Sequence, residues 1–347
     1  GETRTERVAF TPSEQAYVAD FCGLDKRWED HPETGETVLT CQVVALADCE
    51  LHGHTGSIVH VPSGAVVNPV DKPANWNQVR GRVLSRRPPI DGQCLSLVTF
   101  ARGHKQYFHF LAEYLLWVCH YMVHHHQPGT PITILTRPDL APFQESALAF
   151  LRQRYPEMRH ETLGETEKVA TPGLVWLFRK GRNPYHSFVD QQAIALLRAL
   201  YIDGYGLAKA APEKPLLLYA SRADAKLRNF TNDAAVRALL DQRGFETHVV
   251  GNLDHPTQAR LFHAAAVVVC AHGAALTSQI FCRPGTHVIE ISAADFVQST
   301  YLWMAKQLSL NHHPVIGGKG DSQQNFEVDI PALTAVLDSL DIKETAP

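Results

Sequence analysis

The sequence predicts an α/β protein with parallel sheets, arranged as two units behind a β-rich N-terminal segment. From about residue 95 onward, short apolar runs alternate with segments of helical spacing, the pattern of parallel sheets with right-handed crossovers. The alternation pauses at Gly204 to Pro215, where glycine, proline and alanine predict a linker. The expected segments are 1–85 (β-rich), 86–205 and 206–325 (the two α/β units), and 326–347 (a closing strand and helix).

Each expected element follows from its local pattern. In the N-terminal segment strands are expected at 37–46, 57–61 and 65–67. In the first unit the expected strands are 95–100, 132–135 and 173–178, and the helices 107–123, 142–155 and 189–200. In the second unit the expected strands are 216–219, 245–250, 266–270 and 287–291, and the helical segments 233–243, 256–264 and 273–282. A strand at 326–328 and a helix at 331–340 are expected to close the chain.

Composition excludes several classes of protein. The 347 residues are 45% hydrophobic and 20% charged with a net charge of -4, so no basic field indicates nucleic acid as a partner. No apolar run reaches the length of a membrane helix, and the polar N-terminus lacks a signal-peptide pattern. Seven irregularly spaced cysteines fit a reducing compartment. We therefore expect a cytoplasmic location, including the inner membrane face, while a trimmed secretory-pathway chain stays open.

The histidine run at residues 124–126 invites a metal interpretation. Consecutive residues on one element point in different directions, so a surface patch is favoured over a metal site. No metal and no cofactor are expected.

A strand-to-helix turn predicts an anion site. The apolar run Ala266 to Cys270 reads as a strand buried on both faces, and it stops at His272 before small residues begin a helical segment. Ligands of α/β sheets gather at this end of the strands, where backbone N–H groups are free. The groups expected to bind are the N–H groups of Gly273, Ala274, Ala275 and Leu276.

A second stretch, LYASRADAKLRNFTND from Leu218 to Asp233, concentrates cations where another strand ends. Arg222, Lys226 and Arg228 follow Ser221 within seven residues. Guanidinium groups match the forked geometry of phosphate oxygens, so a phosphate site is favoured if this stretch shares a sheet with Gly273. A solvated basic loop paired with acids such as Asp224 is the alternative.

A third stretch, GHKQYFHFLAEYLLWV from Gly103 to Val118, places a histidine and an acid on one helix face. His109 and Glu113 are four residues apart, among apolar neighbours. Such a pair is costly to bury unless it is used or paired. A general base and a structural pair that staples the helix both remain open.

Together these stretches resemble glycosyltransferase family 61. HGAALTSQIFCRPGTHVIEI resembles the HGAGLTNxxFxPPGxxVIE block of that family, LYASRADAKLRNFTND its YxSRxxAxxRxxxNE block, and YFHFLAEYL its HWLLE-type helix. The segment ADCELHGHTGSIVHVPSGAVV also looks like the lead-in of bacterial members, so the resemblance spans about residues 45 to 340. The chain departs from the pattern at Ala275 (usually glycine), Phe110 (usually tryptophan) and Asp233 (usually glutamate).

The resemblance implies a GT-B-like architecture, with two Rossmann-like domains facing a cleft, and a metal-independent, inverting transfer from a nucleotide sugar in polysaccharide biosynthesis. A UDP-sugar is the favoured donor, and a glycan or glycoconjugate the acceptor. Arg222 and Arg228, with the backbone at Gly273 to Leu276, would hold the diphosphate, and Ser221 and Thr277 would add neutral hydrogen bonds. No DxD-like acidic pair is placed to hold a metal.

The remaining site residues carry two interpretations each. Glu290 would grip the ribose hydroxyls, or pair with a neighbouring basic residue at the end of its strand. His272 would contact phosphate or sugar, or fix the turn by bonding backbone. Glu113 or His109 would take the acceptor proton, with Asp295 in reserve.

Three other functions compete with sugar transfer. One is a GT-B-like nucleotide-sugar epimerase, and another is a degenerate nucleotide-sugar-binding domain, which the Ala275 departure favours. A Rossmann-type oxidoreductase is the weakest, because no GxGxxG with a downstream acid follows any strand.

Overall fold

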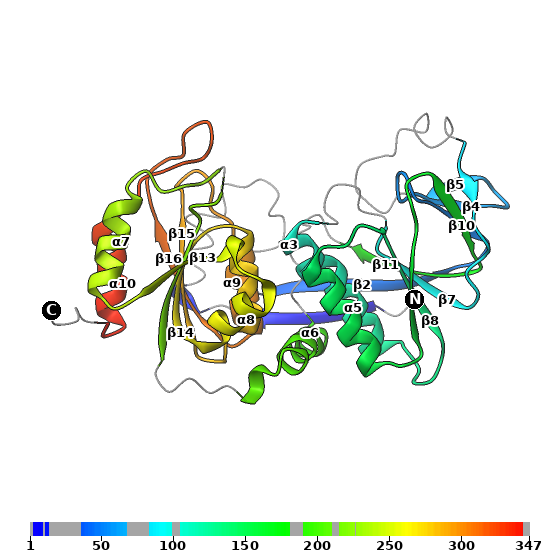
Figure 1. The fold of residues 1–347 in the computed structure, drawn as a ribbon, viewed down its shortest axis with the longest axis horizontal. Coiled ribbons are helices and arrows are strands. Elements are labelled where there is room, and N and C mark those ends of the chain that lie inside the picture. The colour runs from blue at the N-terminus through cyan, green and yellow to red at the C-terminus, as the bar shows by residue number, and fades with distance from the viewer. Residues whose placement is uncertain are drawn as a thin grey trace. The chain divides into compact units, whose positions relative to one another are not determined.

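The computed structural model describes residues 3–9, 11–13, 36–67, 83–98, 105–180, 190–209, 215–225 and 227–342. It is a mixed α/β structure with three sheets (Figure 1). Contacts divide the chain into two compact units. The first comprises Gly1–Glu6, Leu39–Gly181 and Ala195–Leu200, and the second Arg7–Val38, Arg182–Ile194 and Tyr201–Pro347. Among the described residues, no helix is long and apolar enough to cross a membrane.

The largest sheet has six strands in the order β1-β2-β11-β7-β8-β9. Their bounds are β1 Thr3–Ala9, β2 Glu36–Leu46, β7 Gln93–Ser96, β8 Ile132–Thr136, β9 Met158–Thr162 and β11 Gly173–Lys180. Strands β11, β7, β8 and β9 run parallel, as the alternating pattern predicts, whereas β2 is antiparallel to β11. The helices of this half are α3 Tyr107–His109, the π-helical η2 Phe110–Leu115, α4 Leu116–His124, α5 Pro142–Arg154 and α6 Gln191–Gly204.

A second sheet, in the order β5-β4-β3-β10-β6, explains why the β-rich segment is not a separate unit. Its strands are β3 Cys49–His52, β4 Ile58–His60, β5 Ala65–Val67, β6 Ser85–Arg86 and β10 Glu167–Thr171. Cys49, Leu51 and Ile58 share one apolar cluster with Cys94 and Leu135 of the larger sheet. Buried Glu50 binds Lys168 and Arg86, each at 2.9 Å. These contacts join the N-terminal strands to the first α/β unit.

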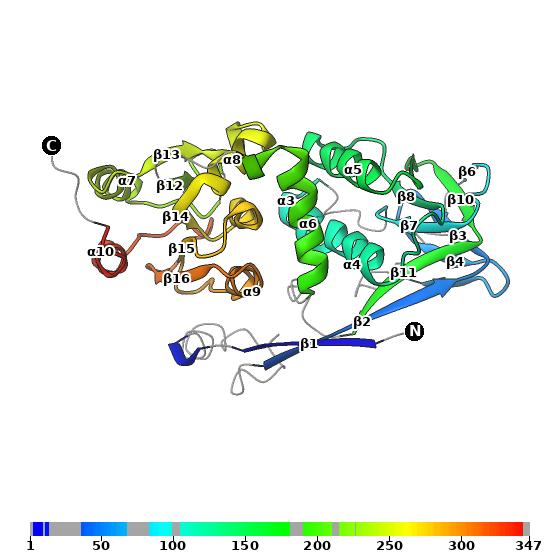
Figure 2. The ribbon, with the colours of Figure 1, turned by 90° about the horizontal axis from the view of Figure 1, so that it is seen from below.

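The third sheet is entirely parallel, in the order β13-β12-β14-β15-β16. Its strands are β12 Leu216–Ser221, β13 Glu246–Val249, β14 Ala265–Ala271, β15 His287–Ser292 and β16 Asn311–Ile316. One face is covered by α7 Asp233–Gln242 and α10 Ile330–Ser339. The other is covered by α8 His255–Ala264, the 3-10 helix η5 Ala274–Phe281 and α9 Thr300–Gln307 (Figure 2). The short helices η3 Leu207–Lys209 and η4 Val250–Asn252 complete this half.

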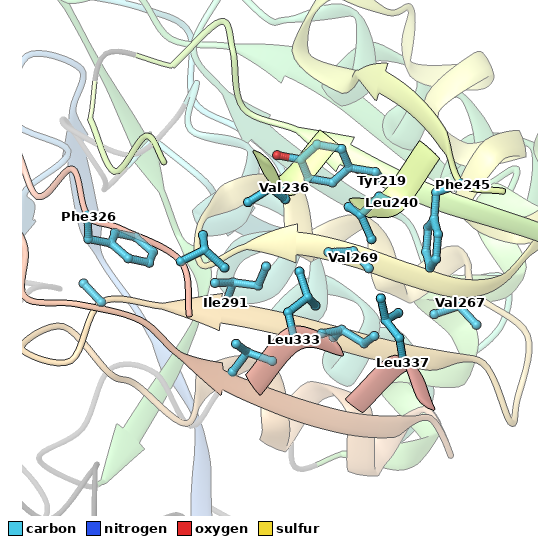
Figure 3. Packing of buried hydrophobic residues seen from close by; sticks show 14 residues of the cluster. Tyr219, Val236, Leu240, Phe245, Val267, Val269, Ile291, Phe326, Leu333 and Leu337 are labelled. Carbon is cyan, nitrogen blue, oxygen red and sulfur yellow. The ribbon is translucent and has the colours of Figure 1, made fainter. Parts of the chain in front are cut away.

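The main apolar cluster of this sheet fixes which strand residues face which helices. Leu333 and Leu337 of α10 point at the strands, beside Val269 and Ile291 (Figure 3). Burial of each such side chain stabilises the fold by about 1.5–3 kcal/mol. Successive strand residues point to opposite faces, so Glu290 points away from this cluster, toward the side of η5 and α9.

Several elements differ from the sequence-based expectation. The expected helix at 273–282 is a 3-10 helix, and the expected strand at 326–328 reduces to one bridge between Phe230 and Phe326. Strand β16 was not expected, because histidines and Pro314 interrupt its apolar pattern. It occupies the sheet edge, where a proline is tolerated. Part of the expected linker, 210–214, lies outside the described residues, and α6 continues through Gly204.

Candidate functional site

The third sheet reverses its strand order at β12. Strand β13 lies on one side of β12 and β14 on the other, so the carboxyl ends of β12 and β14 form a topological switch point, the usual ligand site of open α/β sheets. A cavity of about 170 Å³ lies there. Its lining is Tyr219, Ala220, Arg222, Ala223, Arg228, Asn229, Phe230, Asp233 and Ala271. The structure therefore brings the basic stretch and the end of β14 to one cavity, which is the condition under which the sequence favours a phosphate site.

Arg222 and Arg228 enter this cavity without a carboxylate partner among the described residues. The Nε atoms of both guanidinium groups are buried and have no hydrogen-bond partner in that part of the chain. Their contacts with carbonyl oxygens are long, 3.4 Å from Arg222 Nη2 to Leu227 and 3.4 Å from Arg228 Nη1 to His272. Burial, and then the charge of Arg222, lower the pKa of Arg228. An anion bound between the two guanidinium groups would offset both the loss of hydration and the repulsion between the like charges.

The backbone holds Arg228 in an unfavourable conformation. Its φ of 61° lies in the left-handed region, which costs roughly 1–3 kcal/mol for a residue with a side chain. The surrounding loop is tied to the C-terminal segment: Arg228 N–H donates to Gln323 O at 3.1 Å, and Asn229 N–H donates to Asn325 Oδ1 at 2.9 Å. The guanidinium also lies 5.3 Å from the ring centre of Phe296. These contacts fix the cation before any ligand binds.

The turn at Gly273 supplies fewer donors than expected. Leu276 N–H donates to Gly273 O at 2.9 Å, whereas the N–H groups of Gly273, Ala274 and Ala275 have no backbone acceptor among the described residues. The Leu276 and Thr277 side chains are fully buried. Three free backbone donors therefore remain at the start of η5. The Leu276 N–H is already used within the turn and the Thr277 side chain is buried, so the geometry does not support the contributions that the sequence led us to expect from them.

Ser221 is bound to protein rather than open to a ligand. Its Oγ accepts hydrogen bonds from Arg237 Nη2 at 2.8 Å and from Ala223 N–H at 3.3 Å. Arg237 also pairs with Asp233 at 2.6 Å, and Asp233 accepts the Tyr219 hydroxyl at 2.8 Å. Tyr219 and Asp233 of this network line the cavity. Asp233 and Arg237 are four residues apart on one helix, a spacing that could have revealed the pair in the sequence.

Glu290 lies beneath the turn and has no exposed surface. Its Oε1 accepts from His272 Nδ1 at 2.5 Å, and its Oε2 accepts from His312 Nε2 at 2.7 Å. Burial raises the pKa of Glu290, but the two hydrogen bonds outweigh it and hold the pKa at about 2. Both oxygens are thus occupied by basic neighbours. A ribose contact stays a prediction that would require the histidines to release the carboxylate.

In the first unit, His109 and Glu113 form the pair that their spacing predicts. His109 Nδ1 lies 2.8 Å from Glu113 Oε2, with the His109 side chain 33% exposed and the Glu113 side chain 12% exposed. The hydrogen bond to Glu113 raises the pKa of His109 against the opposing effect of burial. The pair lies at the start of a π-helical stretch, a feature frequent at functional sites. A base and a structural pair both fit this geometry.

Comparison with known families decides the enzyme class. The model of the family described as "Glycosyltransferase 61" matches residues 107–289, just over half of the chain. The chain belongs to glycosyltransferase family 61. Among solved structures, it is similar to the bacterial iron-containing dodecameric glycosyltransferase TibC from enterotoxigenic E. coli H10407. Identity is 12%, coverage 76% of this chain and 78% of that chain, and the TM-score 0.31. No curated protein matches the sequence.

The family 61 match contains nearly every residue predicted for the site. It spans the His109–Glu113 pair, the basic stretch and the turn, and it ends one residue before Glu290. Lys226 lies outside the described residues. Asp295 is exposed, and its Oδ1 accepts Gly320 N–H at 2.9 Å.

The histidine run of this glycosyltransferase is not simply a surface patch. His126 is buried and lies 2.7 Å from Glu157 Oε1, while His124 and His125 are half-buried. Sequence reasoning also missed His312 and Arg237. His312 lies on β16, whose strand pattern is too weak to place it beside Glu290.

Proposed function

We propose that this glycosyltransferase moves a sugar, with inversion, from a UDP-sugar to a hydroxyl of a glycan or glycoconjugate acceptor. One observation carries the proposal: within the described residues, Arg222 and Arg228 stand without carboxylate partners at the switch point of a parallel sheet. Two like charges held close together, each with a buried Nε, are costly unless an anion joins them. A diphosphate fits this requirement, because its oxygens accept the forked donors of guanidinium groups.

The architecture within this proposal is GT-B-like, with two Rossmann-like domains. The second unit supports the donor-binding role through its parallel sheet, its cavity and the free N–H groups at the start of η5. The first unit supplies the His109–Glu113 pair for the acceptor side. The two roles thus come from separate parts of the chain.

The chemistry is a single displacement at C1 of the donor sugar. The acceptor oxygen forms a bond to C1 while the bond from C1 to the β-phosphate oxygen breaks, and that electron pair leaves with the phosphate. Glu113, oriented by His109, takes the acceptor proton. Arg222, Arg228 and the Gly273 turn stabilise the charge that develops on the departing UDP. One displacement from the opposite face inverts the anomeric centre.

We propose that transfer needs no bound metal, because two guanidinium groups and a turn of free N–H groups can balance the charge of the leaving diphosphate. The cytoplasmic location also stays a proposal. It is supported by the five cysteines within the described residues, which are buried thiols outside any disulfide: Cys49, Cys94, Cys119, Cys270 and Cys282.

The decisive experiment measures UDP release from UDP-sugars with and without a panel of glycan acceptors, and follows the donor by NMR. Acceptor-dependent UDP release, with a product of opposite anomeric configuration, is the expected result. Conversion of the donor into a new nucleotide sugar without acceptor would indicate an epimerase. Binding of UDP without turnover on any acceptor would indicate a nucleotide-sugar-binding domain. No binding of any nucleotide would overturn the diphosphate site itself.

A further inference from the structure

The most unusual buried group of the second unit is the Glu290 carboxylate. It lies in the middle of a parallel strand, has no exposed surface, and is held by His272 at 2.5 Å and His312 at 2.7 Å. The His272 residue is 6% exposed and the His312 side chain 1%. A buried ionic cluster is seldom more stabilising than apolar residues of the same volume. Packing alone therefore does not account for a carboxylate at this position.

The cluster fixes the orientation of His272. An ionised carboxylate only accepts hydrogen bonds, so His272 Nδ1 carries hydrogen and donates it to Glu290. The rings of Phe296 and Tyr301 pack edgewise on the imidazole, with centroids 5.4 Å and 5.2 Å away. Among the described residues, the hydrogen bond of the His272 side chain runs through Nδ1, and none is found at the opposite ring nitrogen, Nε2. One ring nitrogen is thus committed to Glu290, and the other is left to a ligand.

Three contacts tie this histidine to the anion cavity. Its carbonyl oxygen lies 3.4 Å from Arg228 Nη1. Phe296 packs against both the imidazole of His272 and the guanidinium of Arg228. The next residue, Gly273, lies against the Arg222 guanidinium. His272 is therefore held beside both cations.

We propose that Glu290 and His312 are positioning residues, which hold His272 so that Nε2–H donates to the β-phosphate oxygen of the departing diphosphate, and that Glu290 does not bind ribose. This inference rests on the proposed transferase function. As the bond from C1 breaks, its electron pair passes to the phosphate oxygen, and the hydrogen bond from Nε2–H strengthens with the growing charge. For both ring nitrogens to donate, the imidazole carries a proton on each, and the Glu290 carboxylate balances the charge of that cationic form from the other side. His312 secures the second oxygen, so that the carboxylate cannot rotate away from His272.

The first test compares Glu290→Gln and His312→Gln with His287→Gln as the matched control. His287 lies on the same strand as Glu290 but pairs with His313, at 2.9 Å. We expect Glu290→Gln to lower kcat at least about tenfold and to weaken UDP while leaving the affinity for uridine unchanged. His312→Gln should lower kcat less, and His287→Gln should leave it unchanged. A kcat of folded Glu290→Gln within about twofold of the parent would overturn the proposal.

A ribose ligand would behave differently. If Glu290 binds ribose, Glu290→Gln weakens UDP and uridine by the same factor, and 2′-deoxy-UDP no longer distinguishes the variant from the parent. That outcome would also overturn the inference.

The second test does not depend on turnover. Imidazole ¹⁵N signals of the parent protein are recorded with UDP and with uridine, and His272→Asn assigns the His272 signals. We expect UDP to shift the His272 Nε2 signal, and uridine to leave it in place. Tight UDP binding without that shift would refute the role of His272 while leaving the donor site intact. Absence of UDP binding would instead refute the proposed function.

Discussion

The guanidinium group of Arg222 lies directly against the backbone of Gly273, so closely that a Cβ on Gly273 would stand 2.0 Å from Nη1. No side chain fits there unless the guanidinium moves. Gly273, which begins the turn of the HGAALTSQIFCRPGTHVIEI stretch, thus leaves room for Arg222 of the LYASRADAKLRNFTND stretch. The two sequence stretches form one site through this contact.

The Gly273→Ala substitution should therefore impair binding and also lower stability. The end of an arginine side chain can move at little cost, but the φ of 158° at Gly273 is one that residues with a side chain rarely adopt, so we also expect a lower melting temperature. Displacement of Arg222 should weaken UDP binding by up to about 1.5–3 kcal/mol, the worth of a hydrogen bond to a charged group. Calorimetric titration with UDP measures the effect. Gly318→Ala is the control, because its added Cβ would meet no atom closer than 3.6 Å. Equal UDP affinity in both variants would contradict the predicted displacement.

Removal of a cation tests the diphosphate site directly. We expect Arg222→Ala to weaken UDP by about 1.5–3 kcal/mol, which is roughly a tenfold to hundredfold loss of affinity. Uridine, which lacks phosphate, should bind both proteins alike. Arg260→Ala, which removes an exposed cation from α8, is the matched control and should leave UDP binding unchanged. If Arg222→Ala retains the UDP affinity of the parent, the stretch is only a solvated basic loop.

Chelation tests the proposed metal independence. Activity should survive excess EDTA, because guanidinium groups and backbone N–H groups can balance the leaving charge without a cation. Initial rates before and after chelation are the measurement. Loss of activity that manganese or magnesium restores would show that this mechanism is incomplete.

The Glu113→Gln substitution separates a base from a structural pair. Loss of a general base typically costs about a hundredfold to ten-thousandfold in rate, with donor binding nearly intact. We therefore expect Glu113→Gln to bind UDP normally and to transfer sugar very slowly. A structural pair would instead give a lower melting temperature with near-normal turnover. His109→Ala, measured alongside, shows whether the histidine orients the acid. If Glu113→Gln turns over within a few-fold of the parent, Asp295 is the next residue to test.

His255 should make the second unit sensitive to acid. It is buried, its Nδ1 lies 2.7 Å from the Tyr205 hydroxyl, and burial lowers its pKa to about 4. The unfolded chain binds this proton near pH 6.5, so the contribution to stability is complete above that pH and is lost as pH falls toward 4. Between pH 7 and 5 the loss from this group is about 2 kcal/mol. Urea unfolding of parent and His255→Asn at both pH values measures it. An equal pH dependence in the two proteins would contradict this assignment.

Much of the fold follows from local sequence. The apolar run of β14, the amphipathic helices and the proline and glycine breaks specify an alternating α/β chain, because each pattern determines its own element. The same local logic places cations after β12 and a small-residue turn after β14. Parallel strands bring their carboxyl ends to one edge, so the sequence favours a phosphate site there on the condition that both stretches share a sheet, which the structure shows they do.

Tertiary packing decided the rest. Sequence could not show that Ser221 is occupied by Arg237, or that Glu290 is shared by His272 and His312. Those partners come from a helix, from the turn after β14 and from an edge strand. Sequence also could not show the left-handed backbone of Arg228, which the distant segment around Gln323 imposes. Local pattern fixes the order and type of elements, whereas the free or occupied state of each polar group depends on neighbours far along the chain. For this protein, the sequence by itself determined the family and the location of the cations, and the tertiary structure decided which residues remain available to a substrate.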